Sequence, residues 1–354
     1  MEKARLSDIA NLAGVSKAAA GKVLNGGRAQ IRVGTEARKR ILEAARQLNY
    51  QPNMAASILA GGSSKMIGVL IDSRAPESMY GILAEIELAA DALGYRILTA
   101  QAHDNPEKLM QSYYALKQNG VDGIISFSHD YSHLGCRLDQ RLKDDHKIVF
   151  VLNTDEENTS AVDVDFRSGM SIALEHLRSR GYRKTALVLS GSGSRNNLPL
   201  SCRNRLDGFQ QNCPRKQAFL LNSPSIDVCR LGEECRRLVQ EALIPEKYDS
   251  ALVMNDLFAF VLMDALTEAG LDIPADFGVV GCDNHPIGAC YPVKLTTLNY
   301  DRIKIARSAL QVLLEKIAGN SDPVRMIFPM ELVVRESTNK ITDIISSRKG
   351  KNHD

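Results

Sequence analysis

The 354-residue sequence contains no tryptophan, and aromatic residues make up only 5% of it. Its seven cysteines include no C-x-x-C pair and no Cys/His group at zinc-binding spacing, and their odd number argues against a closed disulfide framework. No apolar run approaches the roughly 18 residues of a membrane span, and the N-terminus is charged and amphipathic, unlike a signal peptide. We therefore expect a cytoplasmic protein with reduced thiols, no metal, no cofactor and no membrane partner.

Length and charge say more about the architecture. At roughly 100–200 residues per domain, the chain is long enough for two or three domains. The total charge is only +2, but residues 1–60 hold ten Lys or Arg against four Asp or Glu, a net of +6, which leaves the rest at −4. A basic N-terminal region on a mildly acidic body is typical of a protein that meets phosphate, and a solvated helical face is the equally good alternative on charge alone.

The first fifty residues have the pattern of a helix-turn-helix. Apolar residues recur at helical spacing from Leu6 to Ala13, and Gly14-Val15-Ser16 interrupts them, with Ser16 as the N-cap of a second helix that starts at Lys17. The outward face of the second helix carries Lys17, Ala18, Gly21, Lys22 and Asn25. A third helix is predicted over 35–48, capped by Thr35, with Ala37, Ile41, Leu42, Ala45 and Leu48 buried. In such a unit the second helix enters the DNA major groove.

Three ordered blocks in this region carry a resemblance to the LacI/GalR family of transcriptional regulators. The blocks are Leu6-Ser-Asp-Ile-Ala-Asn-Leu-Ala-Gly-Val-Ser16, Val23-Leu-Asn-Gly26 and Leu48-Asn-Tyr-Gln-Pro-Asn53. The resemblance implies a double-stranded DNA operator as partner. The residues it implies in DNA contact are Ser16, Lys17, Ala18, Lys22, Asn25, Tyr50, Asn53, Ala56 and Leu59.

The resemblance also makes the segment 54–61 a hinge helix that orders on the operator, with Leu59 as a minor-groove wedge. A short Ala-rich segment before Gly61-Gly62 is too short to be stably helical alone, so its folding can be coupled to DNA. The alternative is a plain linker with Leu59 packed on the body. Two departures from the family pattern stand out: Ala20-Gly21-Lys22 replaces the usual Val-Ser-Arg, and Ser57 replaces a basic hinge residue. Base preference is therefore not carried over.

From residue 65 onward, β-type runs alternate with helical ones, which predicts parallel βαβ units. The expected strands are 66–71, 96–99, 123–127, 148–152, 185–189, 218–221, 250–254 and 278–281. The expected helices are 79–93, 106–119, 168–180, 203–212, 231–243 and 256–269. Two similar α/β lobes result, and a ligand is expected between them, where the loops at the carboxyl ends of the strands converge.

The resemblance extends over about residues 4–336, and the family core is similar to periplasmic sugar-binding proteins. The implied fold is an all-α helix-turn-helix headpiece followed by a two-lobed α/β core of parallel sheets flanked by helices. The expected parts are 1–50 for the helix-turn-helix domain, 51–64 for the hinge and linker, 65–163 with 295–323 for the first lobe, 164–294 with 324–336 for the second lobe, and 337–354 for a polar tail.

By position in the family motifs, Arg205, Asn255 and Asp283 match residues that contact the effector. Their chemistry suits a hydroxyl-rich ligand, because a guanidinium donates, a carboxylate accepts and an amide does both. Weaker candidates, for which a helix cap or a core aromatic is as good an interpretation, are Asp72, Tyr80, Phe127, Asp165 and Phe258. The predicted effector is a carbohydrate or carbohydrate derivative, with a nucleobase-type metabolite as the alternative.

Other functions have less support in the sequence. An enzyme would need arranged catalytic groups, but there is no Gly-rich phosphate loop after the first strand and no G-x-S-x-G elbow. A stand-alone solute-binding protein would not need a basic N-terminal domain. The tail 337–354 lacks sustained leucine heptads, so a homodimer is expected rather than a four-chain assembly. We thus expect an effector-responsive repressor, not an enzyme, that binds a palindromic operator as a homodimer.

Overall fold

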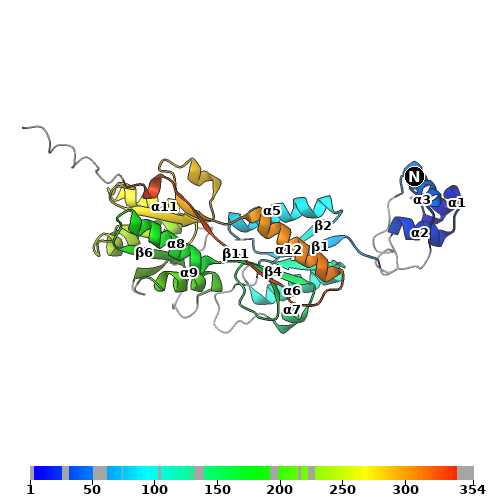
Figure 1. Ribbon diagram of the computed structural model, residues 1–354, viewed down its shortest axis with the longest axis horizontal. Helices are drawn as coiled ribbons and strands as arrows, with labels where there is room; N and C mark the ends of the chain where they lie inside the picture. The colour runs from blue at the N-terminus through cyan, green and yellow to red at the C-terminus, as the bar shows by residue number, and fades with distance from the viewer. Residues whose placement is uncertain are drawn as a thin grey trace, which may run out of the picture.

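A computed structural model describes residues 4–25, 32–50, 62–73, 75–102, 105–128, 130, 139–191, 198–213, 217–221 and 228–340. Within these ranges the chain forms a small domain of three helices and two α/β lobes, each built on a six-stranded sheet (Figure 1). The predicted fold class is confirmed. No helix in these ranges combines the length and the apolar character needed to cross a bilayer.

The helical domain contains α1 (Leu6–Ala13), α2 (Lys17–Asn25) and α3 (Thr35–Gln47). Gly14 takes a left-handed conformation (φ +62°) that ends α1, as the turn between the first two helices requires. The buried core is small and consists of Ile9, Ala10, Ala13, Ala20, Ile41 and Ala44. Two predictions for α3 are wrong: Gly34, not Thr35, occupies its N-cap, and Leu42 and Leu48 are exposed because they lie off the face that packs on α1 and α2.

The first lobe is a fully parallel sheet in the order β11-β5-β4-β3-β1-β2. Its strands are β1 (Met66–Ile71), β2 (Arg96–Gln101), β3 (Gly123–Ser126), β4 (Ile148–Val151), β5 (Ser160–Val164) and β11 (Arg325–Phe328). Its helices are α5 (Glu77–Ala92), α6 (Pro106–Gln118), α7 (Gln140–Asp144) and α12 (Arg302–Ile317). The central strands are buried almost throughout, as expected when helices cover both faces of a parallel sheet.

The second lobe repeats this plan in the order β12-β10-β9-β8-β6-β7, and only β12 runs antiparallel. Its strands are β6 (Thr185–Ser190), β7 (Ala218–Leu221), β8 (Ser250–Val253), β9 (Gly278–Cys282), β10 (Thr296–Asn299) and β12 (Glu331–Val333). Its helices are α8 (Phe166–Ser179), α9 (Leu200–Gln210), α10 (Val228–Leu238), which continues as a π-helical turn (Val239–Leu243), and α11 (Asp256–Glu268). Short 3₁₀ turns cover Pro286–Ala289 and Glu336–Thr338.

The chain passes between the lobes after β5, after β10 and after β11. Strand β10 belongs to the second sheet and β11 to the first, so the expected boundaries at 294/295 and 323/324 are wrong by about five residues each. The remaining part of the 295–323 segment, α12, packs on α5 of the first lobe as expected. A single apolar core runs on through both lobes and includes Ile67 and Val149 of the first and Leu187 and Leu252 of the second.

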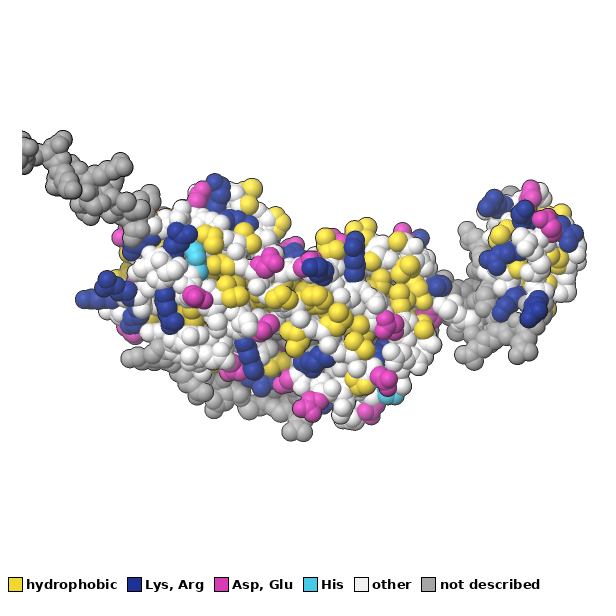
Figure 2. All heavy atoms as spheres, viewed as in Figure 1, with side chains coloured by type: hydrophobic (Ala, Val, Ile, Leu, Met, Phe, Trp, Pro, Cys, Tyr) yellow, Lys and Arg dark blue, Asp and Glu magenta, His cyan; other side chains and the backbone are white. Residues whose placement is uncertain are grey.

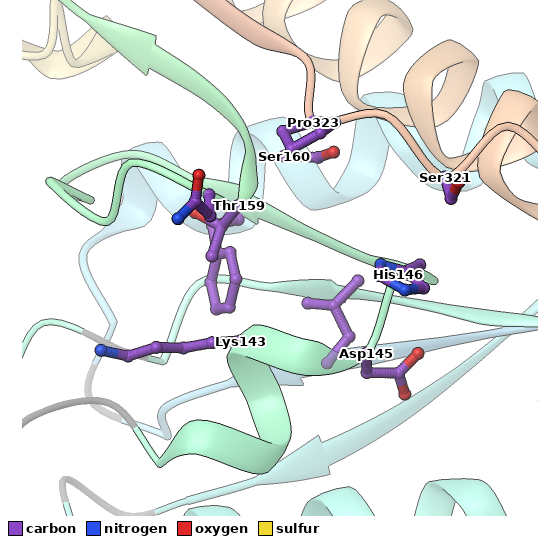
Figure 3. A pocket seen from close by; sticks show the side chains of 10 residues that line it. Lys143, Asp145, His146, Thr159, Ser160, Ser321 and Pro323 are labelled. Carbon is purple, nitrogen blue, oxygen red and sulfur yellow. The ribbon is translucent and has the colours of Figure 1, made fainter.

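A pocket at the N-terminal ends of β4 and β5 in the first lobe is too small to hold a ligand (Figure 3). Lys143, His146, Thr159 and Ser321 are among the side chains around it, and its volume is about 10 Å³. That volume holds at most about one water molecule.

Candidate functional site

Helix α2 presents the predicted DNA-facing residues at the surface. Ser16 caps α2, because its Oγ accepts a hydrogen bond of 3.1 Å from the backbone N–H of Ala19, as predicted. Ser16, Lys17 and Ala18 are exposed, and Lys22 is half-buried. The backbone N–H of Tyr50 donates to Ala45 (2.9 Å), and the ring packs on the helical core. Asn53, Ala56 and Leu59, and the side chain of Asn25, lie outside the described residues.

The surface around α2 is rich in cations. Figure 2 shows Lys and Arg side chains over much of the visible face of the helical domain. Exposed members on α3 are Arg38, Lys39, Arg40 and Arg46. Because the ion pair of Lys39 with Glu36 (3.5 Å) lies at the surface, it neutralises this face only weakly. The domain thus offers a polyanion a set of accessible positive charges.

A cavity of about 260 Å³ lies between the two lobes. The first lobe contributes the N-terminus of α5, and the second lobe contributes the N-terminus of α11 and the loop after β9. The side chains that line it are Ala75, Pro76, Glu77, Ser78, Asn255, Asp256, Leu257, Phe260, Asp283, His285 and Ile287. The position matches the predicted one, and the volume approaches the range usual for small-molecule sites.

Asp283 is held at the cavity wall by contacts from both lobes. Its carboxylate accepts hydrogen bonds from the Ser78 hydroxyl and the Tyr300 hydroxyl, both at 3.2 Å, and its carbonyl accepts one of 2.6 Å from Arg302. Asp283 and Asn284 both have positive φ, +100° and +51°, a conformation that costs non-glycine residues on the order of 1 kcal/mol or more. A strained loop held this tightly indicates that the position of the carboxylate matters.

Arg335 fixes the same loop from the C-terminal end of the chain. Its guanidinium donates to the side-chain oxygen of Asn284 and to the carbonyl of Leu295, both at 2.7 Å. The sequence did not single out Arg335. Its role depends on β12 lying beside β10, which is a pairing between distant segments.

Asp256 is a second buried carboxylate at the cavity, and the sequence did not predict it. It accepts hydrogen bonds of 2.6 Å from the Thr297 hydroxyl and the His285 backbone N–H. Burial raises the pKa of Asp256 to about 7; the Thr297 hydrogen bond opposes the rise and the nearby Asp283 carboxylate adds to it. A Cβ atom at Gly281 would lie 2.1 Å from Oδ1 of Asp256, so this glycine is needed for the close approach. The only signal in the sequence was the position of Asp256 beside Asn255.

Asn255 lines the cavity as predicted, whereas the prediction that Arg205 lines it is wrong, because the Arg205 side chain is buried against Cys282 and Phe166. The Asn255 side-chain oxygen caps α11 by accepting from the N–H of Phe258 (2.9 Å), which leaves its NH₂ group for other partners. Arg205 is 6% exposed and donates to the Ser201 carbonyl (3.0 Å) and the Cys282 sulfur (3.7 Å). Its Nε has no hydrogen-bond partner in the described part of the chain.

The weaker candidates do not line this cavity. Phe127 and Phe258 are core residues, with 4% and 0% of their surface exposed. The aromatic side chain at the cavity is instead Phe260, because residues two apart on a helix point in different directions. Asp165 caps α8, where it accepts from the Ser168 N–H (3.0 Å). Asp165 is thus a helix cap, and the two phenylalanines are core aromatics, whereas Tyr80 is exposed and donates to the backbone carbonyl of Asp72 (2.9 Å).

The described residues contain no group of three or more His, Cys, Asp or Glu side chains placed to hold a metal ion. The six cysteines within these ranges are all free thiols. Burial raises the pKa of Cys202 to about 11 and also raises that of Cys282, beside the Arg205 guanidinium. These thiols are therefore protonated side chains of the protein interior.

Comparison with known proteins agrees with both parts of this geometry. Residues 5–53 match the bacterial regulatory proteins of the lacI family, and residues 174–338 match a periplasmic binding protein-like domain. The chain is 26% identical over 345 residues to the HTH-type transcriptional repressor PurR of Haemophilus influenzae (strain PittEE), covering 96% of this chain and 99% of the relative. It is 27% identical to the lactose operon repressor of Escherichia coli (strain K12), covering 96% and 91%.

The solved structures give the same result. The lac repressor dimer bound to operator and the anti-inducer ONPF superposes with a TM-score of 0.79 at 27% identity, covering 95% of this chain and 99% of that one. A LacI family regulator from Enterococcus faecium with bound ribose shares the fold, with a TM-score of 0.65 at 23% identity, covering 78% and 100%. Both the helical domain and the lobes thus have known relatives.

Proposed function

Because the chain belongs to the LacI family of bacterial regulatory proteins, we propose that it is a transcriptional repressor that binds a palindromic DNA operator as a homodimer and responds to a small polar effector. One observation carries the DNA-binding part: α2, the second helix of a helix-turn-helix, presents exposed Lys17 and Ala18 from a basic surface. In this proposal the protein acts by binding and catalyses no reaction.

The proposed operator contacts fall into two groups. The side chains placed in or beside the major groove are Ser16, Lys17, Ala18, Lys22, Asn25 and Tyr50. The remaining proposed contacts, Asn53, Ala56 and Leu59, belong to the hinge, with Leu59 wedged into the minor groove. A small residue such as Ala18 at the exposed start of α2 supports this reading, because it lets the helix backbone approach the base edges.

The surface of the first lobe supports the homodimer. Leu88 of α5 and Ile327 of β11 are 63% and 60% exposed, and Ile303 of α12 is 45% exposed. Helices α5 and α12 pack side by side, and Figure 2 shows hydrophobic side chains along this face of the lobe. Apolar surface gathered in this way is typical of a protein–protein contact. A dimer places two helical domains at the two halves of a palindrome.

For the effector we propose a carbohydrate or a carbohydrate derivative in the cavity between the lobes. Asp283, Asp256 and the Asn255 amide provide acceptors and a donor for hydroxyl groups. Phe260 is the one aromatic among the described lining residues, and its ring is already stacked on Tyr291 (4.7 Å between centroids). Because Tyr291 occupies one face of this ring, less aromatic surface is left for a flat nucleobase to stack on. A nucleobase-type effector therefore remains the alternative outcome of the test.

The test of DNA binding is selection of genomic fragments by the full-length protein, followed by footprinting of the selected site. We expect protection of a symmetric sequence by a dimer. Equal affinity for all fragments would contradict the proposal. Calorimetry with a panel of sugars, sugar derivatives and nucleobases then identifies the effector class, and a nucleobase that alone binds would overturn the carbohydrate assignment.

The hinge has a test of its own. If Leu59 is a wedge, circularly permuted operator fragments show a bend that Leu59→Ala removes. An unchanged bend returns the segment to the role of a plain linker with Leu59 packed on the body.

A further inference from the structure

A pair of hydrogen bonds joins the two lobes at the N-terminus of α9. Asp130 follows β3 of the first lobe, and its two carboxylate oxygens accept from the backbone N–H groups of Leu200 (2.5 Å) and Ser201 (2.9 Å). These two groups form the first turn of α9 in the second lobe. Asp130 thus supplies the N-terminal cap of a helix that lies on the other lobe, 70 residues further along the chain.

Helices α6, α8 and α11 have local caps. Asn105, Asp165 and Asn255 each accept from an N–H two or three residues further along the chain. In α9 the local N-cap position is Pro199, which has no side-chain acceptor, so its first N–H groups depend on Asp130. A carboxylate at this place also faces the positive end of the α9 dipole. The cap of α9 is therefore complete only while the lobes keep this arrangement.

The same turn of α9 determines where Arg205 lies. The Arg205 guanidinium donates to the Ser201 carbonyl (3.0 Å), and the N–H of Ser201 is one of the two groups held by Asp130. The guanidinium also lies 4.0 Å above the Phe166 ring, and its buried Nε has no hydrogen-bond partner in the described residues. A shift of this turn would therefore move the Arg205 side chain.

Other contacts between the lobes do not duplicate this one. Arg203 of α9 approaches Asp155 of the first lobe at 3.9 Å, but both side chains are more than half exposed, so the pair contributes little. At the cavity, Ser78 and Arg302 of the first lobe both donate to Asp283 of the second. Among the described residues, Asp130 and Asp283 are therefore two carboxyl-containing residues that accept buried or half-buried hydrogen bonds from the other lobe.

We propose that Asp130 is a positioning residue that locks the relative arrangement of the two lobes, and so of the effector cleft between them, through the N-terminus of α9. The inference rests on the proposed function only in calling this space an effector cleft. The locking itself is a property of the protein without DNA or ligand. It is a control point for any signal that passes from the cleft to the helical domain.

Hydrogen exchange followed by mass spectrometry tests this on the full-length protein, with no ligand added. Asp130→Ala should raise exchange at Leu200 and Ser201 by about ten-fold or more, and at Asp283 and Asn284 across the cleft by about three-fold or more. Asp130→Asn keeps one acceptor oxygen and should fall in between. Asn105→Ala is the matched control, because Asn105 also accepts from two backbone N–H groups (2.9 and 3.1 Å) but within one lobe.

Small-angle X-ray scattering supplies the second readout. We expect the Asp130→Ala curve to differ from that of the wild type and the Asn105→Ala curve to superimpose on it. A rise in exchange confined to α9, with an unchanged scattering curve, would reduce Asp130 to a helix cap and overturn the proposal. Neither measurement needs operator or effector. The result therefore tests the role of Asp130 whether or not the proposed function is correct.

Discussion

The helical domain and the cleft use their charged side chains in opposite ways. On α2 and α3, Lys17, Arg38, Lys39, Arg40 and Arg46 are exposed at the surface, where an external partner can reach them. Asp256 and Asp283 at the cleft, and Arg205 beside Cys282, are at most 9% exposed, and hydrogen bonds within the protein hold each of them. A change in the first region should therefore alter binding with little effect on folding. A change in the second region should alter both effector binding and the stability of the fold.

The largest expected effect is the salt dependence of operator binding. If the dimer neutralises six to ten phosphates, affinity falls by about 10³–10⁵ between 50 and 200 mM salt, because releasing counterions into a more concentrated salt solution gains less free energy. The free energy of unfolding should change far less over the same range, since the cleft charges are buried. Fluorescence anisotropy with a labelled operator, beside urea unfolding in the same buffers, measures both. An operator affinity that does not change with salt would contradict the proposed difference between the exposed charges of the helical domain and the buried charges of the cleft.

The next effect concerns Asp256 and pH. Its folded-state pKa of about 7 exceeds the ordinary value of 3.8, so the folded protein binds the proton more tightly than the unfolded chain does. The resulting stability is fully present below about pH 4 and is lost as pH rises through 7, by on the order of 4 kcal/mol. Asp256→Asn should remove this part of the pH dependence. Urea unfolding at intervals from pH 4.5 to 7.5 measures the free energy of unfolding of both proteins. If it changes with pH equally in the wild type and in Asp256→Asn, the prediction is contradicted.

A smaller effect is expected at Lys17. Lys17→Ala should relax base preference at one position of each half-site, at a cost of about 1–3 kcal/mol, if its amine reads a guanine edge. Stability should stay within about 0.5 kcal/mol of the wild type, because the side chain is exposed. Lys39→Ala on α3 is the control and should lower affinity for all sequences alike. If Lys17→Ala also lowers the affinity for all sequences alike, Lys17 contacts a phosphate rather than a base. The same comparison distinguishes the two roles for Lys22→Ala.

The smallest effect is that of Gly21→Ala inside α2. Helix propensity favours alanine by about 1 kcal/mol, but the new methyl group would lie 3.3 Å from Cδ2 of Leu6. The leucine side chain has to shift slightly, so we expect a net gain of at most about 1 kcal/mol, seen as slower hydrogen exchange in α2 by up to about five-fold. Faster exchange would show that the contact with Leu6 outweighs propensity.

The sequence predicted the parts that depend on short-range patterns. Helices α1 and α2, the Ser16 cap and most central strands follow from apolar periodicity and turn residues. It missed β5, β10, β11, β12 and α12, whose places depend on the chain crossing three times between the lobes. In the cleft, Asn255 and Asp283 were predicted at the cavity. Asp256, Phe260 and Arg335 were not, because burial and long-range pairing, rather than local pattern, bring them there.

The central claim is that DNA binding and effector sensing reside in separate regions. Asp283→Ala tests it most directly, through operator affinity measured with and without the ligand that the calorimetric panel identifies for the wild type. We predict that the variant binds operator with wild-type affinity but no longer responds to that ligand. The binding free energy of the ligand should weaken by about 1–3 kcal/mol, as expected when one partner of a buried hydrogen-bonded site is lost. Wild-type ligand affinity and response in Asp283→Ala would contradict the account.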